Sequence, residues 1–234
     1  MAVVAGIDGC PGGWLCLNKD LSSGEVTALI LRDIRELTAL RPRPEVALVD
    51  VPIGLTDAGP RQCDLEARKR LGAPRSRSVF PAPIRPTMPA ASYSQACEMG
   101  AAVDGRKLSK QTWAILPKIS EVDAFLRSDL SLQLWIREVH PEVSFWAWND
   151  GRAMASKKKS LAGRIEREAL VKSRYEVAYA AARSTLPRRL YANDDLLDAF
   201  AALWSAERVI AGSAIFLPAT HPVDSCGLRM EMVA

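Results

Sequence analysis

The sequence has few histidines and lacks the cysteine spacing of common zinc sites. Its 234 residues include two histidines, and the five cysteines are scattered without a Cys-x-x-Cys pair. An odd number of scattered cysteines argues against both a structural zinc site and a disulfide framework. Unpaired thiols are typical of a reducing compartment, so we expect a cytoplasmic protein.

Long apolar runs are also missing. No run approaches the ~18–20 residues that span a bilayer, and the first residues lack the pattern of a signal peptide. The composition, 48% hydrophobic and 25% charged, is that of an ordinary globular protein. We therefore expect no membrane partner and a single domain over residues 1–234, with an insertion at about 60–128.

Net negative charge is absent, and the positive charge is unevenly distributed. The formal net charge is +4, yet residues 61–77 carry six basic and two acidic groups, and residues 152–174 carry eight and two. Two basic windows on an otherwise acidic chain indicate a polyanion such as nucleic acid as partner. The alternative is that both windows are solvated helix faces. Residues 157–159 (KKK) are expected to form an exposed loop that can contact phosphate.

Single carboxylates follow short apolar runs at two places in the first 50 residues. Residues 3–7 lead to Asp8 and a Gly/Pro loop, and residues 46–49 lead to Asp50 before Pro52 and Gly54. Such runs, bounded by turn residues, predict buried strands. A carboxylate at the end of a buried strand is costly unless it is paired or binds a cation. The alternative for Asp8 is that it only caps its turn.

The remaining pattern predicts an α/β fold. Residues 14–18 and 25–31 are typical of a hairpin, which with residues 3–8 forms an antiparallel meander. Residues 132–139 predict a further strand that leads to Glu138 and Glu142, and residues 227–233 predict an edge strand. Helices are expected at 34–40, 60–72, 91–103, 109–128 (kinked at Pro117), 164–185 and 195–204, and a proline-rich loop at 73–90.

Two acids three residues apart open the last predicted helix. Asp195 and Asp198 are neighbours on one helix face. Together with the acids at the strand ends they would supply the oxygen ligands that Mg²⁺ or Mn²⁺ prefers. The alternative is that they cap the helix and complement its dipole. His140 is either a general base or a hydrogen-bond partner of the turn before Pro141.

Seven segments resemble one family, domain of unknown function family 429, whose members are predicted RNase H-like nucleases. They are residues 6–14 (GIDGCPGGW), 50–55 (DVPIGL), 61–68 (RQCDLEAR), 78–83 (SVFPAP), 110–115 (KQTWAI), 138–145 (EVHPEVSF) and 194–199 (DDLLDA). The resemblance covers nearly the whole chain. It implies an RNase H-like mixed five-stranded sheet, a meander followed by parallel strands, flanked by helices and carrying a helical and loop insertion.

The resemblance also implies an active site and a function, namely metal-dependent hydrolysis of nucleic acid. The metal ligands, for Mg²⁺ or Mn²⁺, would be Asp8, Asp50, Asp195 and Asp198. Glu142, which belongs to this family's own pattern, joins them as a catalytic residue, either a ligand, a base or a partner of an arginine. The expected substrate-binding residues are Arg61, Arg68, Arg77, Ser78 and Lys118. Resolvase-like relatives suggest a homodimer by analogy.

Two other functions stay open at this point. Sugar and acetate kinases share the implied fold, but residues 9–13 contain no Ser or Thr for a phosphate, and the chain is short for two duplicated domains. A binding module without catalysis would keep the sheet and use its acids structurally, since a fold does not determine a function.

Overall fold

The computed structural model describes residues 2–234, which form two compact units. The sheet unit comprises residues 2–51, Trp135–Ile215 and Val233–Ala234. The helical unit comprises Pro52–Leu134 and Phe216–Met232, and it includes the whole of the predicted insertion at 60–128. Among the described residues, no helix combines the length and the apolar character needed to cross a membrane.

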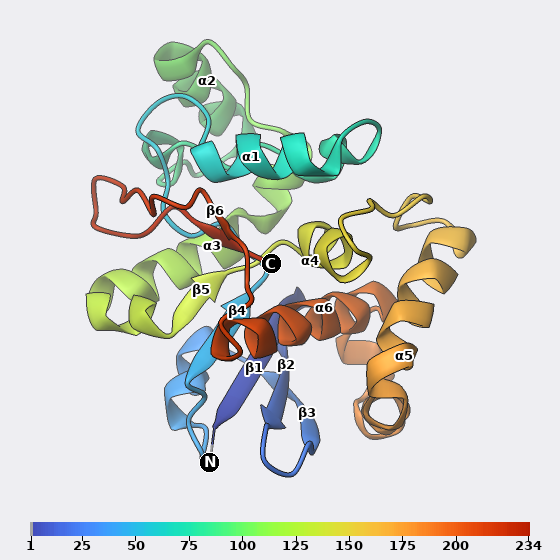
Figure 1. The fold of residues 1–234 in the computed structure, drawn as a ribbon. Helices are drawn as coiled ribbons and strands as arrows, with labels where there is room; N and C mark the ends of the chain where they lie inside the picture. Colours follow the sequence, from blue (N-terminus) through green and yellow to red (C-terminus); the bar gives the residue numbers. More distant parts are fainter. Residues whose placement is uncertain (1) are drawn as a thin grey trace. The chain divides into compact units, whose positions relative to one another are not determined.

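A mixed five-stranded sheet forms the centre of the sheet unit (Figure 1). The strands are β1 (Val3–Cys10), β2 (Gly13–Asp20), β3 (Val26–Leu31), β4 (Val46–Val49) and β5 (Ile136–Glu138). Their order is β3-β2-β1-β4-β5: β1, β2 and β3 are antiparallel neighbours, whereas β4 runs parallel to both β1 and β5. This confirms the predicted α/β fold with a mixed five-stranded sheet, in which an antiparallel meander is followed by parallel strands.

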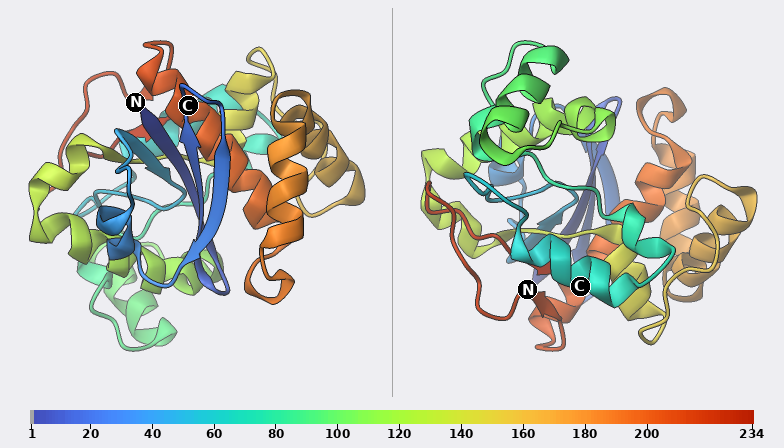
Figure 2. Two further views of the ribbon diagram at one scale, coloured as in Figure 1. Left: turned by 90° about the horizontal axis from the view of Figure 1, so that it is seen from below. Right: turned by 90° about the horizontal axis from the view of Figure 1, so that it is seen from above.

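Helix α6 (Asn193–Ile210) packs directly against the central strand β1 (Figure 2). A Cβ atom on Gly6 would lie 2.1 Å from the backbone nitrogen of Leu203 and 2.3 Å from the carbonyl oxygen of Ala199. Only glycine permits so close an approach of strand and helix. The close packing brings the acids near the start of α6 to the sheet.

The other helices of the sheet unit are η1 (Ile34–Ala39), α4 (Pro141–Trp148), α5 (Leu161–Thr185) and η5 (Arg188–Leu190). α5 contacts β3 and α6, and its backbone departs from helical angles at Tyr175. Trp148 of α4 stacks on Trp204 of α6 with ring centroids 5.1 Å apart. This stacking contact holds α4 against α6.

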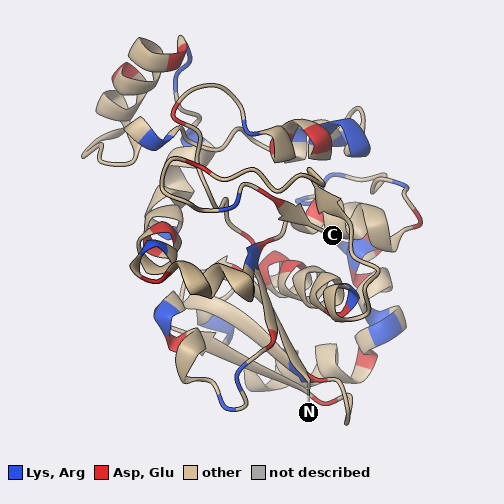
Figure 3. Ribbon diagram, turned by 60° about the vertical axis from the view of Figure 1, so that its left-hand side comes forward, with Lys and Arg blue, Asp and Glu red and all other residues tan. Residues whose placement is uncertain are grey.

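The helical unit consists mainly of α1 (Gln62–Leu71), α2 (Tyr93–Asp104) and α3 (Lys110–Ser128). Its shorter elements are η2 (Arg75–Ser78), η3 (Arg85–Thr87), η4 (Leu130–Leu134) and β6 (Phe216–Leu217), and β7 (Met232–Val233) follows at the C-terminal end. Arg85 links two segments of this unit by ion pairs with Asp123, at 2.9 Å, and with Asp224. Figure 3 shows the basic residues that close α1.

Several predicted boundaries were wrong. The strand expected at 132–139 is confined to Ile136–Glu138, because Asp129 accepts the backbone N–H of Ser131 and starts the 3₁₀ turn η4. The edge strand expected at 227–233 shrinks to Met232–Val233. The proline-rich stretch 73–90, expected as a loop, contains two 3₁₀ turns, η2 and η3. The helix expected at 109–128 is present as α3, with Pro117 inside it.

Candidate active site

Three carboxylates from distant parts of the chain meet in the sheet unit. Asp8 lies near the end of β1, Asp50 directly follows β4, and Asp198 lies in the second turn of α6. The N–H of Asp50 donates to the carbonyl of Ile7 over 2.9 Å, so the parallel strands end side by side. One carboxylate oxygen of each residue lies within 4.8 Å of the other two. We call this group the carboxylate cluster.

Burial makes the carboxylate cluster electrostatically costly. Asp8 is 7% exposed and Asp198 is 1% exposed. Burial raises the pKa of Asp8 well above its ordinary value, and the charges of Asp50 and Asp198 raise it further. For the same reasons, burial first and Asp198 second, the pKa of Asp50 rises to about 8. Burial raises the pKa of Asp198 to about 6, although Lys158 opposes the shift.

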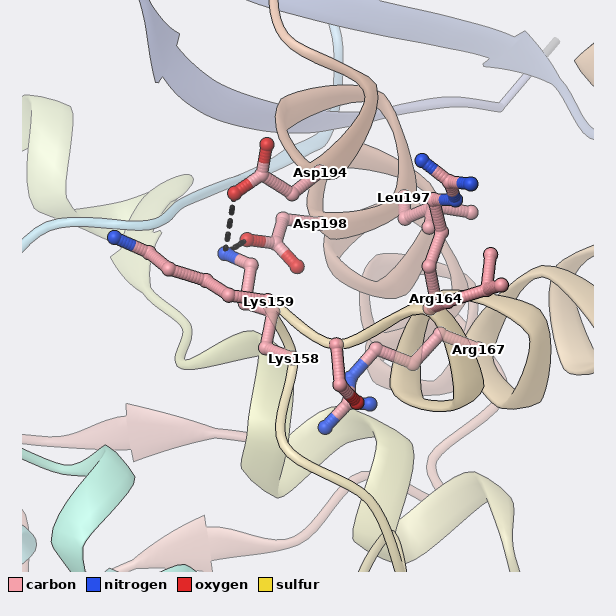
Figure 4. Close-up of a pocket in the computed structure, with 9 residues that line it drawn as sticks. Lys158, Lys159, Arg164, Arg167, Asp194, Leu197 and Asp198 are labelled. Atoms are coloured by element: carbon pink, nitrogen blue, oxygen red, sulfur yellow. Dashed lines mark hydrogen bonds and ion pairs between the residues drawn. The ribbon is translucent and has the colours of Figure 1, made fainter.

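Lys158 supplies a cation that faces Asp198 and Asp194 (Figure 4). It belongs to the segment between α4 and α5, and its ammonium contacts the Asp198 carboxylate and lies 4.0 Å from Oδ2 of Asp194. Burial alone would lower the pKa of Lys158, but the charges of Asp198, Asp8 and Asp50 outweigh it and raise the pKa. Sequence analysis missed this residue, because nothing distinguishes the middle lysine of the KKK run from its neighbours.

A cavity of about 190 Å³ adjoins Lys158 and Asp198. It lies between the start of α5 and the start of α6 and therefore borders one side of the carboxylate cluster (Figure 4). Its lining residues are Lys158, Lys159, Ser160, Leu161, Arg164, Arg167, Asp194, Leu197 and Asp198. The cavity is thus basic on the α5 side and acidic on the α6 side.

The carboxylate cluster is chemically suited to a hard divalent cation. Its donors are carboxylate oxygens, the ligands that Mg²⁺ and Mn²⁺ prefer. Oδ1 of Asp198 is buried and accepts no hydrogen bond from any of residues 2–234. A buried carboxylate oxygen without a partner is unfavourable unless a ligand completes it. Asp8, Asp50 and Asp198 therefore fit the predicted metal site.

Asp195, the fourth predicted ligand, is not one of the three clustered acids. Its Oδ2 accepts the backbone N–H of Ala192 over 2.8 Å and so caps the start of α6. Burial raises the pKa of Asp195. This contact matches the capping alternative for Asp195, whereas Asp198, one turn later, faces the sheet.

Glu142 is engaged by an arginine. It lies in the first turn of α4, and Arg167 of α5 donates to its two carboxylate oxygens over 2.8 and 2.7 Å. Glu142 is 4% exposed and Arg167 is 1% exposed. Of the roles considered for Glu142, the structure therefore shows partnership with an arginine. His140 accepts the N–H of Glu142 at Nδ1, and Glu138, buried at the end of β5, adds to the raised pKa of Asp50.

The five predicted substrate-binding residues all belong to the helical unit. Arg61 is 2% exposed and donates to Asp64 over 2.6 Å and to the carbonyl of Ile53 over 3.1 Å. Arg68 donates to the carbonyl of Val79 over 2.8 Å. Arg77 is exposed, whereas Ser78 and Lys118 are partly buried. Because these donors of Arg61 bind atoms of its own unit, the contacts indicate that Arg61 has a structural role.

Of the comparisons with known proteins, the one with family models agrees with the family resemblance. No curated protein matches the chain, and no solved structure matches it. The family model described as "Protein of unknown function (DUF429)" matches residues 6–222, a range that contains the three clustered carboxylates, Lys158 and the Glu142–Arg167 pair. The chain therefore belongs to the DUF429 family.

Proposed function

We propose that this protein is a Mg²⁺- or Mn²⁺-dependent nuclease or related phosphodiesterase that acts on nucleic acid. One observation carries the proposal: three carboxylates from β1, the end of β4 and α6 lie within 4.8 Å of one another. Their mutual repulsion and burial raise the pKa values of Asp8 and Asp50. An arrangement that lowers stability in this way is typical of a functional site.

Different residues would have different roles in the proposed reaction. Asp8, Asp50 and Asp198 would hold the metal, which when bound stabilises negative charge on the attacking and leaving oxygens of a phosphodiester. Lys159 and Arg164, which line the adjoining cavity, would attract the phosphates that flank the cleaved bond. Glu142 would keep Arg167, and with it the first turn of α5, in place.

Location and assembly belong to the same proposal. None of the described cysteines forms a disulfide, and four of them, Cys10, Cys16, Cys63 and Cys97, are buried. This supports a reducing, cytoplasmic location. We also propose a homodimer, on the analogy with resolvase-like relatives.

Hydrolysis assays on single-stranded, duplex and junction substrates test the proposal. With Mg²⁺ or Mn²⁺ we expect cleavage of at least one substrate, and none with chelator. Asp198→Asn should lower the rate on the order of 100-fold or more, because a neutral ligand removes charge from the metal site. Asp150→Asn, which changes a carboxylate that is 87% exposed, should cleave like the wild type. Cleavage that survives both chelator and Asp198→Asn would contradict the proposal.

A further inference from the structure

The carboxylate cluster already contains one cation of its own. The ammonium of Lys158 contacts Asp198, and the charges of Asp8 and Asp50 act on it as well. A divalent ion bound to Oδ1 of Asp198 would meet the ammonium that contacts Oδ2 of the same carboxylate at short range and would be repelled by it. Both cations therefore compete for Asp198.

The backbone around Lys158 is held in place, whereas its side chain has a route out. Glu166 accepts the N–H groups of Ala155 and Ser156 over 2.7 and 3.1 Å. The hydroxyl of Ser160 donates to the carbonyl of Lys157 over 2.7 Å and so closes the other end of the segment. The Lys158 side chain is still 34% exposed. Its ammonium can thus leave Asp198 by a change of rotamer alone.

The cavity beside the carboxylate cluster offers the released ammonium a place. Lys159 and Arg164 also line this cavity, and across residues 2–234 neither side chain has a carboxylate within ion-pair distance. An ammonium that turns away from Asp198 would join Lys159 and Arg164 as a positive charge without a carboxylate partner there. Metal binding would then make the cavity more attractive to a phosphate group.

We propose that Lys158 is an exchangeable counter-cation: its ammonium occupies Asp198 until a divalent ion displaces it, and then turns to bind a substrate phosphate in the adjoining cavity. This inference rests on the proposed metal-dependent function and adds an order of binding to it. Because coupling between two sites is reciprocal, a phosphate-bearing ligand will in turn tighten metal binding.

Mn²⁺ calorimetry on Lys158→Met measures the competition. We expect the variant to bind Mn²⁺ about tenfold more tightly than the wild type, since no ammonium has to be displaced. Lys157→Met, which removes an exposed neighbouring lysine, should bind Mn²⁺ like the wild type.

A second measurement uses the unchanged protein and so does not depend on how the variant folds. Lysine acylation is followed by mass spectrometry with and without Mn²⁺. Lys158 should become several-fold more reactive when Mn²⁺ is present, while the exposed Lys157, which does not line the cavity, keeps its reactivity.

The outcomes separate this inference from the proposed function. Mn²⁺ binding that leaves the reactivity of Lys158 unchanged, or that is equal or weaker in Lys158→Met, overturns the exchange and leaves the nuclease proposal standing. Tight binding by Lys158→Met with weak binding by the wild type supports the exchange. No Mn²⁺ binding by either protein overturns both.

Discussion

We expect Asp50→Asn to be more stable to unfolding than the wild type at pH 8 in the presence of chelator. The pKa of Asp50 is raised to about 8 in the folded protein, chiefly by burial and by the charge of Asp198. In the unfolded chain the same group titrates near its ordinary value of about 4. The folded wild type therefore keeps a proton that the unfolded chain has lost over this pH range.

The sign of the pH dependence follows from this difference in bound protons. Below about pH 4 both states are protonated, and Asp50 costs no stability. As the pH rises from about 4 to 8, the wild type loses stability, and the loss levels off once the folded group ionises. Asparagine does not ionise, so its stability does not fall over this pH range. The free energy of unfolding of Asp50→Asn should therefore exceed that of the wild type by a few kcal/mol at about pH 8.

Urea unfolding at pH 5 and pH 8 measures this advantage. Asp150→Asn, at an exposed carboxylate, provides the matched control and should show no such pH dependence. Added Mn²⁺ should stabilise the wild type more than Asp50→Asn, because it removes the same penalty. An Asp50→Asn variant that is less stable than the wild type at pH 8 would show that Asp50 contributes to folding and does not oppose it.

Glu142→Gln should lose about 3 kcal/mol of unfolding free energy. The change leaves the guanidinium of Arg167, 1% exposed, without its carboxylate partner, and a buried charge without a partner is strongly destabilising. We expect Mn²⁺ affinity to stay within about threefold of the wild type, because Glu142 is not one of the clustered carboxylates.

The matched control is Glu176→Gln, which changes an exposed glutamate on α5 and should alter stability by less than about 0.5 kcal/mol. Urea unfolding and Mn²⁺ calorimetry on the three proteins separate the two roles of Glu142. A normal stability with lost Mn²⁺ binding would make Glu142 a metal ligand and would contradict the structural role assigned to it.

The sequence predicts those members of the carboxylate cluster that lie at the ends of apolar strands. Asp8 and Asp50 each end an apolar run, and the parallel pairing of β1 with β4 brings such ends together. The roles of Asp195 and Asp198 on α6 were harder to distinguish, because their spacing alone does not tell which side chain faces the sheet. Asp195 accepts the backbone N–H of Ala192, whereas Asp198 reaches the cluster, since Gly6 lets α6 approach β1.

Charge was the least informative part of the pattern. The basic windows at 61–77 and 152–174 suggested a polyanion, yet Arg61, Arg167 and Lys158 each pair with an acid inside their own unit. Long-range ion pairs such as Lys158–Asp198, which join residues 40 positions apart, leave no local trace in a sequence. The exposed basic residues of these windows, which include Lys159 and Arg164, are the ones that a substrate could contact.

Mn²⁺ calorimetry on the wild type and on Asp8→Asn tests the central claim, that the carboxylate cluster holds a divalent cation, most directly. The substitution is nearly isosteric and removes one charge from a group that is 7% exposed. We predict saturable binding by the wild type at millimolar Mn²⁺ or below, and its loss in Asp8→Asn while the folded state is retained. No binding by the wild type, or equal binding by both proteins, would contradict the account and would favour a binding module that uses these acids structurally.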